Sequence, residues 1–304
     1  MATQILVQEI IDFLGPDLIE VYGEFKNLYV KHLKPLSSVD RDTLDWVNPS
    51  IVNKQEISEK SNARVIIVDS DVQYTKKIAS QKKVLIIVDN PKLTLAKIGN
   101  NFFVEKYEAG IHGSAVIHPE AKIGDNLYAA ANVVIGKCHI GDHVVLHPNV
   151  TVNDGVIIGD HVSIKPGAVI GYDGFGYERN EKGDLTKFPQ VGGLIIGDYV
   201  DVGSGCCIDR GSLGDTLIGF NTKINNLCRI AHNVEIGENV VLAGHVNISG
   251  STIIEDNVWV SPCACFRGHQ RVGKKAIIGM GAVVTKDVPP GETWVGNPAR
   301  RIER

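Results

Sequence analysis

The chain has 304 residues, 43% of them hydrophobic and 22% charged, with a formal net charge of −4 at pH 7. This ordinary composition excludes a disordered chain, and the small negative charge gives no reason to expect nucleic acid as a partner. Few aromatic residues, 32 glycines and abundant Ile and Val indicate a β-rich chain with many tight turns.

Residues 1–105 are predicted to form a small α/β domain. Short buried strands are predicted at "ARVIIVDSD" (63–71) and "KKVLIIVDNP" (82–91), because each holds a continuous apolar run that ends in Asp. A helix is predicted to begin at the proline of "NPKLTLAKIGNNF" (90–102).

The first residues, "MATQILVQEIIDFLG", show no basic region, no long apolar core and no cleavage site, so we expect no signal peptide. No apolar run approaches the roughly 20 residues that cross a membrane. We therefore expect a cytoplasmic protein without an integral membrane segment.

From residue 111 onward, an aliphatic or aromatic residue recurs at intervals of six in three separate blocks, with one position skipped in the first block. The recurring residues are Ile111, Ile117, Ile123 and Ile135, then Ile140, Leu146, Val152, Ile158, Ile164 and Ile170, and finally Ile218, Ile224, Ile230, Ile236, Leu242, Ile248, Ile254, Val260, Phe266, Val272, Ile278 and Val284. This period fits neither an amphipathic helix nor a simple two-sided strand. It predicts a parallel β-helix over residues 106–288, with three hexads in each coil and the recurring residue pointing inward.

Two segments interrupt the repeat. The first is a loop at 171–195, rich in Gly, charged and aromatic residues, and the second is "RGSLGDT" (210–216). Insertions leave such a coil as loops and commonly build its binding face, although two passive loops are the alternative. The tail, 289–304, is proline-rich and then basic, so we expect it to leave the coil as a cap or docking strand.

Three histidines, His232, His245 and His269, stand outside the inward positions of the hexads, so we expect them on the outer surface or near corners. They are spread over several coils without close spacing or nearby carboxylates, which does not favour a metal site. An imidazole can accept a proton from an attacking amine or hydroxyl near neutral pH. A solvated turn histidine is the alternative for each.

Several segments carry a resemblance to a known family. They are "WVNP" (46–49), "DNPKLTLA" (89–96), "GYDGFGY" (171–177), "KFPQVGGLIIGDYVDVG" (187–203), "CIDRG" (207–211), "NNLCRIAHNVEIG" (225–237) and "GHQRVG" (268–273). In these segments the chain resembles the UDP-3-O-(3-hydroxyacyl)glucosamine N-acyltransferases of lipid A biosynthesis. The resemblance implies a left-handed parallel β-helix, a homotrimer with active sites in clefts between coils, and a nucleotide- or sugar-binding role for residues 1–105.

The resemblance also implies catalytic residues. His232 matches the base that takes the proton from the sugar's 2-amine, and His269 matches the family's second active-site histidine. Gly250 matches the glycine whose backbone N–H donates to the oxyanion. Asn225 stands where the family commonly has an aspartate that orients the base.

The resemblance assigns further residues to the substrates. The predicted contacts to the nucleotide sugar are Trp46, Asn48, Tyr172, Phe175, Tyr177, Asp209, Asn233 and His245. The family has an aromatic residue where this chain has Asp45, a tyrosine where it has Ile51, and usually a glycine at position 245.

The tail resembles a different group, the coenzyme-A-dependent sugar O- and N-acetyltransferases. Lys286, Arg300 and Arg301 would then contact phosphates of the acyl donor, while a solvated basic end is the alternative. The donor is therefore expected to be a 3-hydroxyacyl carrier protein or an acyl-CoA thioester, used as a co-substrate, with no permanently bound cofactor.

The sequence thus predicts an N-acyltransferase that moves an acyl group from a 3-hydroxyacyl carrier protein to the amine of a UDP-linked amino sugar. The first alternative is an acetyl-CoA-dependent N- or O-acetyltransferase of a nucleotide-linked amino sugar for surface polysaccharide. The second is a non-catalytic hexapeptide scaffold, which predicts a missing base and missing loop motifs. A β-helical carbonic anhydrase would need zinc-binding histidines that the spacing does not support.

Overall fold

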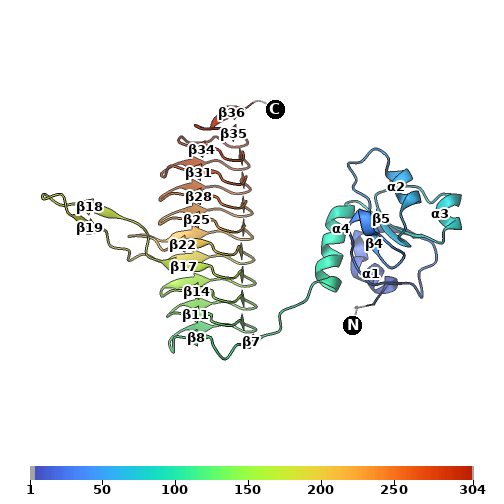
Figure 1. Cartoon of the computed structure of the whole chain (residues 1–304), viewed down its shortest axis with the longest axis horizontal. Coiled ribbons are helices and arrows are strands. Elements are labelled where there is room, and N and C mark those ends of the chain that lie inside the picture. Colours follow the sequence, from blue (N-terminus) through green and yellow to red (C-terminus); the bar gives the residue numbers. More distant parts are fainter. Residues whose placement is uncertain (1–3, 303–304) are drawn as a thin grey trace. The chain divides into compact units, whose positions relative to one another are not determined.

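The computed structural model describes residues 4–302. The chain divides into two compact units, Met1–Lys106 and Tyr107–Arg304 (Figure 1). The first unit is a small α/β structure and the second is a parallel β-helix, so the predicted fold class is confirmed. No helix among the described residues is long and apolar enough to cross a membrane.

The first unit is built on a four-stranded sheet. Its elements are β1 (Ile5–Leu6), α1 (Val7–Leu14), η1 (Gly15–Asp17), β2 (Leu18–Tyr22), β3 (Tyr29–Val30), η2 (Leu36–Ser38), β4 (Leu44–Trp46), α2 (Lys54–Lys60), β5 (Val65–Val68), α3 (Lys76–Ser80), β6 (Val84–Val88), α4 (Pro91–Ile98) and η3 (Gly99–Phe103). The sheet order is β2-β6-β5-β4, with β2 antiparallel to β6 and the other pairs parallel. Strands β5 and β6 and helix α4 lie where the sequence predicts them.

Both faces of this sheet are covered. Val65 and Ile67 of β5 belong to an apolar cluster that includes residues of α1 and α4. Ile66 and Val68 belong to a second cluster, which includes Ile78 of α3. A strand buried on both faces is apolar throughout, which explains the continuous apolar runs in the sequence.

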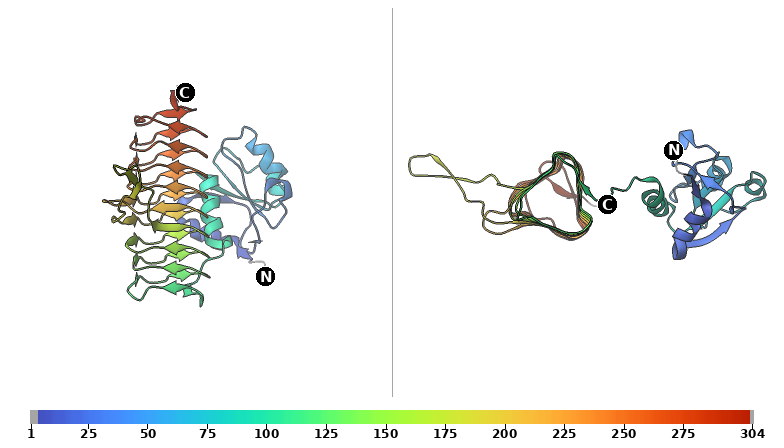
Figure 2. Two further views of the ribbon diagram at one scale, coloured as in Figure 1. Left: turned by 60° about the vertical axis from the view of Figure 1, so that its left-hand side comes forward. Right: turned by 90° about the horizontal axis from the view of Figure 1, so that it is seen from below.

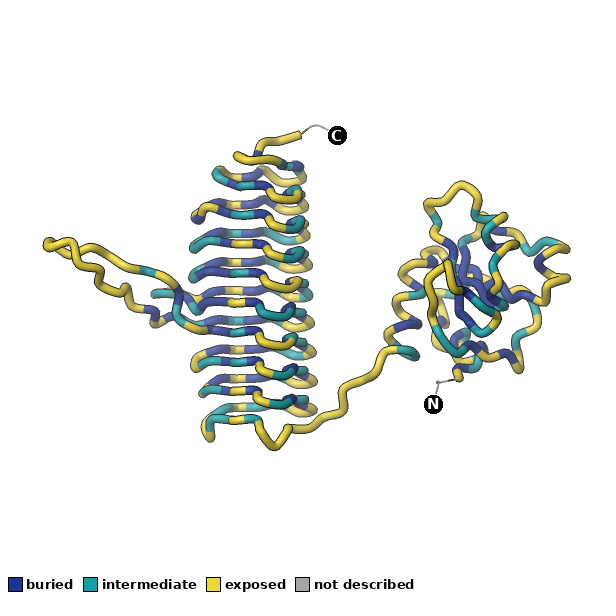
Figure 3. Tube along the Cα trace, in the orientation of Figure 1, coloured by how far each residue is buried: buried dark blue, intermediate teal, exposed yellow. Residues whose placement is uncertain are grey.

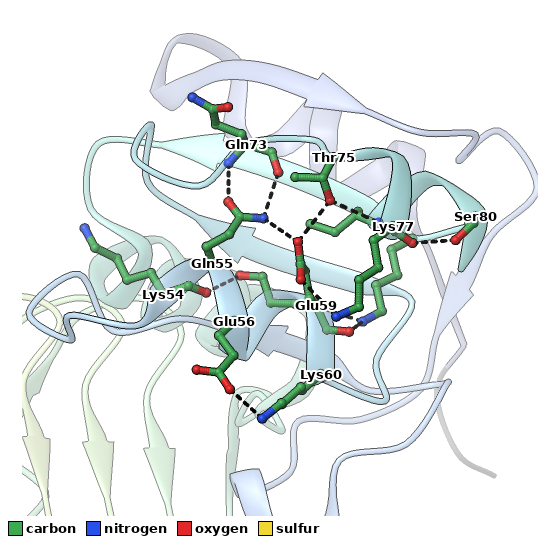
Figure 4. Close-up of polar contacts among 12 residues, drawn as sticks. Lys54, Gln55, Glu56, Glu59, Lys60, Gln73, Thr75, Lys77 and Ser80 are labelled. Carbon is green, nitrogen blue, oxygen red and sulfur yellow. Dashed lines mark hydrogen bonds and ion pairs between the residues drawn. The ribbon is translucent and has the colours of Figure 1, made fainter.

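Polar contacts tie α2 to the segment that leads into α3 (Figure 4). The N–H of Gln73 donates to Gln55 Oε1 at 2.9 Å, and Gln55 Nε2 donates back to the Gln73 carbonyl at 3.2 Å. Glu59 accepts a hydrogen bond from Thr75 Oγ1 at 3.1 Å and pairs with Lys77 Nζ at 3.0 Å. Charge-assisted contacts therefore supplement the apolar packing on this side of the sheet.

The second unit winds into coils with a triangular cross-section (Figure 2). Its three sheets have 11, 9 and 8 strands, all parallel except the last strand of the first sheet, and are named wall 1, wall 2 and wall 3. Wall 1 contains β7 (Gly110–Ile111), β10 (Tyr128–Ala129), β13 (Val145–Leu146), β16 (Ser163–Ile164), β21 (Asp201–Val202), β24 (Lys223–Ile224), β27 (Val241–Leu242), β30 (Trp259–Val260), β33 (Ile277–Ile278), β35 (Thr293–Val295) and β36 (Arg300–Ile302). Wall 2 contains β8 (Val116–Ile117), β11 (Val134–Ile135), β14 (Thr151–Val152), β17 (Val169–Tyr172), β22 (Cys207–Asp209), β25 (Arg229–Ile230), β28 (Asn247–Ile248), β31 (Cys265–Phe266) and β34 (Val283–Val284). Wall 3 contains β9 (Lys122–Ile123), β12 (His139–Ile140), β15 (Val156–Ile158), β20 (Leu194–Ile196), β23 (Thr216–Ile218), β26 (Glu235–Ile236), β29 (Ile253–Ile254) and β32 (Arg271–Val272).

The recurring aliphatic residues form the core of this unit. Ile230, Ile236 and Leu242, one on each wall, are at most 3% exposed and belong to one continuous cluster. Successive coils are in register, so that Ile230 pairs with Ile248 and Ile248 with Phe266. Paired strands lie about 4.8 Å apart. The six-residue repeat therefore predicted correctly which side chains point inward.

Corners of the coil use backbone with positive φ. Asn233, His245 and His269 have φ of 57°, 61° and 62°, in the left-handed region. Asn and His are enriched there among non-glycine residues. The structure thus places His245 and His269 at corners, as their positions in the hexads predict.

The two ends of the β-helix differ from the simple repeat. Ile111 is exposed and Ile117 and Ile123 are only half-buried, because β7, β8 and β9 are the terminal strands of their walls. At the other end, β35 continues wall 1 beside β33, and β36 then turns back antiparallel to β35. Part of the predicted tail is therefore wall, and β36 is the segment that caps it.

We expect the inward column to dominate the stability of the β-helix. Ile158 is 2% exposed, whereas Ile157, its neighbour in β15, is 44% exposed on the outer face. Ile158→Ala should lower the free energy of unfolding by about 2–5 kcal/mol, because it leaves a cavity. Ile157→Ala is the matched control. Thermal and denaturant unfolding of both variants would test this, and equal losses of unfolding free energy would contradict the assigned directions of the two side chains.

Candidate active site

Both interruptions of the repeat leave the β-helix at the same edge, between wall 2 and wall 3. Residues 173–193 connect β17 to β20 and include the projecting hairpin of β18 (Tyr177–Arg179) and β19 (Leu185–Lys187), which is largely exposed (Figure 3). Residues 210–215 connect β22 to β23. This edge, named edge 2–3, also carries His232 after β25 and Gly250 after β28.

An amide network orients the half-buried imidazole of His232. Asn233 Oδ1 lies 3.1 Å from His232 Nδ1 and also accepts from the N–H and Oγ of Ser212, at 3.0 and 2.6 Å. The Asn233 Nδ2 donates to the carbonyl of Gly214 at 2.9 Å, so the amide presents its oxygen to the ring. Because an acceptor faces Nδ1, Nδ1 carries the proton and Nε2 holds the free lone pair.

Two glycines pack against this imidazole. A methyl group on Gly250 would lie 2.7 Å from Cε1 and 2.9 Å from Nε2 of His232. A methyl group on Gly174, in the long loop, would lie 3.0 Å from Cβ of His232 and 2.9 Å from Gln190 Oε1. The long loop and the next coil therefore both reach the ring, and neither has room there for a side chain.

The backbone of Gly250 offers a donor beside the base. Its N–H makes no hydrogen bond to other residues in the range 4–302, whereas its carbonyl accepts from the N–H of His269 at 3.1 Å. A free N–H next to a proton acceptor is an arrangement that can stabilise a developing oxyanion. His269 itself is exposed at edge 2–3, after β31 and two coils beyond the coil of His232.

A groove of about 310 Å³ lies at edge 2–3 on the N-terminal side of His232. Its polar lining includes Asn153, Asp154, Tyr172, Asp173 and Arg210. The Arg210 Nε donates to the carbonyl of Gly192 at 2.7 Å, so the long loop holds this guanidinium in place. The groove can therefore receive a polar group that extends away from the base.

Aromatic side chains of the long loop stay exposed. Tyr172, Phe175 and Tyr177 are 64%, 78% and 44% exposed, and the rings of Phe175 and Tyr177 meet edge to face at 5.1 Å. They are available to a bound molecule or a second chain.

An ion pair with a buried carboxylate and an exposed guanidinium lies on the outer side of wall 2, beside edge 2–3. Asp209 Oδ2 is 2.8 Å from Arg229 Nη2, and the two side chains are 10% and 41% exposed. Burial raises the pKa of Asp209 above its usual value, while the charges of Arg229 and His232 act against that rise.

Two predicted residues lie at a different edge. Asn225 follows β24 and His245 follows β27, so both lie between wall 1 and wall 2. The side chain of Asn225 accepts from the N–H of Asn226 at 2.7 Å, and in this chain Asn233 is the amide that contacts His232. Within one chain the structure therefore does not bring Asn225 to His232, because residues seven apart fall on successive edges of a coil with six residues per wall.

The predicted donor-binding residues are not brought together. Lys286 follows β34 and is exposed at edge 2–3, whereas Arg300 and Arg301 belong to β36 on wall 1. Arg301 pairs with Glu292 at 3.4 Å, and Arg300 Nη1 donates to the carbonyl of Ala299 at 2.8 Å. Within a single chain these three residues therefore do not form one phosphate-binding site.

The predicted nucleotide contacts lie at the end of β4 in the first unit. Trp46 is half-buried against an apolar cluster, and Asn48 is exposed, with its Oδ1 accepting from the N–H of Ser50 at 3.0 Å. Asp45, which replaces an aromatic residue of the family, is buried and accepts from Ser61 Oγ at 2.6 Å. Its role in this chain is thus structural.

Sequence reasoning missed Ser212, Gln190 and Arg229. Ser212 lies in the second interruption, and Arg229 occupies an outward position in the same segment as His232. An arginine in an outward hexad position signals a polar surface, but its partner Asp209 belongs to the previous coil.

Among residues 4–302, no three His, Cys, Asp or Glu side chains are grouped so that they could hold a metal ion.

Comparison with known proteins agrees with this geometry. Residues 137–172 and 215–250 match the family described as bacterial transferase hexapeptide (six repeats). The UDP-N-acetylglucosamine acyltransferase of Bacteroides fragilis 9343 matches with a TM-score of 0.58 and 31% identity, over 64% of this chain and 74% of that one. Fold and repeats thus define a hexapeptide-repeat acyltransferase.

Closer relatives define the family. The UDP-3-O-acylglucosamine N-acyltransferase of Coxiella burnetii (strain Dugway 5J108-111) is 37% identical over 244 residues, 73% of this chain and 71% of that one. This chain belongs to the family of UDP-3-O-acylglucosamine N-acyltransferases. The enzyme of the same name from Caulobacter sp. (strain K31) is 45% identical over 148 residues, so that match spans 43% of the relative's length.

Gly250→Ala keeps the backbone N–H but should displace the imidazole of His232, because its methyl group would meet the ring, and should lower kcat for acyl transfer by about 10²-fold, the scale of a misplaced catalytic group. Gly244→Ala is the matched control, since a methyl group there would meet its nearest atom at 3.6 Å, an ordinary contact. Steady-state kinetics and circular dichroism of both variants would test this. Equal activity of the two variants would contradict the tight contact at Gly250.

Proposed function

We propose that the protein transfers an acyl group from a thioester to the amine of a UDP-linked 3-O-acylglucosamine, in the cytoplasm, as a step of lipid A synthesis. The single observation that carries this proposal is the close approach of Gly250 to His232: a methyl group on Gly250 would lie 2.9 Å from Nε2, and the N–H of Gly250 makes no hydrogen bond to other residues in the range 4–302. Membership in the family supports the same substrate class.

The geometry supports direct attack by the amine. His232 Nε2 takes a proton from the sugar nitrogen as that nitrogen bonds to the thioester carbonyl carbon. The negative charge that develops on the carbonyl oxygen is stabilised by the Gly250 N–H. The carbon–sulfur bond then breaks, and the imidazolium returns the proton to the departing thiolate.

The acyl donor is proposed to be a 3-hydroxyacyl carrier protein, because the sequence motifs around edge 2–3 resemble those of the lipid A enzymes. Lys286 lies at the same edge as His232 and is the residue best placed to meet the donor's phosphate. Arg300 and Arg301 lie on wall 1, so their placement gives less support to a coenzyme A site at this edge.

A homotrimer is proposed as the active form. Apolar residues remain exposed on all three outer faces, including Trp259 on wall 1, Val134 on wall 2 and Ile157 on wall 3. Packing of copies would cover these side chains. The nucleotide is proposed to bind the first unit near Trp46 and Asn48.

A donor test examines the proposed reaction. Purified protein is offered a UDP-3-O-acylglucosamine with either a 3-hydroxyacyl carrier protein or acetyl-CoA, and product is followed by mass spectrometry. We expect turnover with the acylated carrier protein, reduced about 10²–10⁴-fold in His232→Ala. His112→Ala, which changes an exposed histidine directly after β7, is the matched control.

Turnover with acetyl-CoA alone would identify the protein as an acetyltransferase instead. Undiminished turnover in His232→Ala would refute the assignment of the base. If folded wild-type protein turned over neither donor, the scaffold alternative would replace the proposed reaction.

A further inference from the structure

We propose that the first unit has a ligand site of its own, a groove that binds a small organic anion through Arg64 and Lys26. The groove lies at the edge of the sheet where the parallel strands β5 and β6 begin. Trp46 and Asn48, the proposed nucleotide contacts, lie at the opposite edge, where β4 ends. The site is therefore separate from the proposed acyl transfer.

The turn that follows β2 forms one side of this groove. Strand β2 is antiparallel to β6, and its last residue, Tyr22, pairs with Leu85 near the start of β6. Residues 23–28 therefore leave the sheet beside the first residues of β5 and β6. Gly23 has a φ of 100°, and a methyl group there would lie 2.5 Å from the carbonyl oxygen of Lys83. The turn thus packs tightly on the residue that precedes β6.

The groove is large enough for an organic molecule. It encloses about 530 Å³, within the roughly 300–1,000 Å³ of small-molecule sites, and its lining consists of residues 23–28 and Arg64. Leu28 belongs to the apolar cluster that includes residues of α1, and Phe25 packs half-buried against that cluster. The lining therefore offers apolar side chains beside its charged ones, so a ligand can carry an apolar part next to its charged group.

Arg64 brings to the groove a charge that the described residues do not balance. The side chain is half-buried, and its Nε is buried without a hydrogen-bond partner among residues 4–302. The ion pairs of the first unit all join other side chains. Partial burial of an unpaired cation costs free energy, because the cation loses water without gaining a counter-charge. An anion in the groove would supply that counter-charge.

The turn itself adds two features that favour an anion. Lys26 is exposed and contributes a second positive charge, against the one carboxylate of the lining, Glu24. The backbone N–H groups of Lys26 and Asn27 donate to no carbonyl group of residues 4–302. Consecutive free N–H groups beside basic side chains are a common setting for bound anions.

The chemistry of Arg64 defines the class of ligand. A guanidinium presents its N–H groups in a planar fork that matches two oxygens of a carboxylate or a phosphate. The ligand is thus an organic carboxylate or a phosphate monoester with an apolar part. Benzoate and phenyl phosphate represent these two sources, and benzamide has the same ring without a charge.

Calorimetric titration of the full-length protein at low ionic strength tests the site. We expect phenyl phosphate, benzoate or both to bind, and benzamide not to bind. Arg64→Gln should weaken binding of the anion roughly 10- to 100-fold, the scale of hydrogen bonds to a charged group. Arg64→Lys keeps the charge but loses the planar fork, so its affinity should lie between those of wild type and Arg64→Gln.

The matched control is Lys92→Gln, which removes an exposed cation of α4 that does not line the groove. It should leave the affinity for the anion unchanged, and circular dichroism checks that every variant is folded. Equal losses in Arg64→Gln and Lys92→Gln would reduce the effect to general charge attraction and overturn the proposal. Failure of both anions to bind wild type, or binding of benzamide as tight as that of benzoate, would also overturn it.

Titration with UDP separates this site from the proposed nucleotide site. Binding of UDP should persist in Arg64→Gln, and saturating UDP should leave the affinity for the anion unchanged, because the two sites lie at opposite edges of the sheet. Displacement of the anion by UDP would make the groove part of the nucleotide site and overturn the proposal. These measurements need no turnover, so failure of the proposed acyl transfer would leave the result for the groove intact.

Discussion

In-register stacking of coils is the constraint on which the rest of the second unit depends. An aliphatic or aromatic side chain from each hexad fills the interior, and each coil can stack on the next only if these side chains lie one above another. Residues that are 18 positions apart then become neighbours at about the spacing of paired strands, 4.8 Å. The same packing aligns the corner residues of successive coils into columns.

The candidate site follows from this alignment. His232 and Gly250 are 18 residues apart and occupy the same place in successive coils, so the glycine lies directly against the imidazole. Any residue larger than glycine at position 250 would fill the space beside Nε2 of His232. The apolar interior thus positions the imidazole of His232 and the backbone N–H of Gly250 beside each other without a bond between the two residues.

The interruptions supply what the regular coil lacks. The second one brings Ser212 to Asn233, which selects the tautomer of His232. The first one packs Gly174 against the ring and leaves no room for a side chain there. A β-helix without these loops would present His232 as one more corner side chain, and the proposed chemistry depends on the enclosure that the loops provide.

The six-residue period by itself determined the fold class, the inward column and the corner positions of His245 and His269, because spacing along the chain translates directly into direction within a coil. The apolar runs likewise determined β5 and β6. Three matters were decided only by tertiary structure: that Asn233 rather than Asn225 contacts His232, that Asp209 pairs with Arg229, and that Lys286 is separated from Arg300 and Arg301. Each depends on which edge a residue occupies after insertions of irregular length, and on contacts between neighbouring coils. A local pattern specifies direction within its own coil, but it carries no information about the side chain that another coil or a loop will bring beside it.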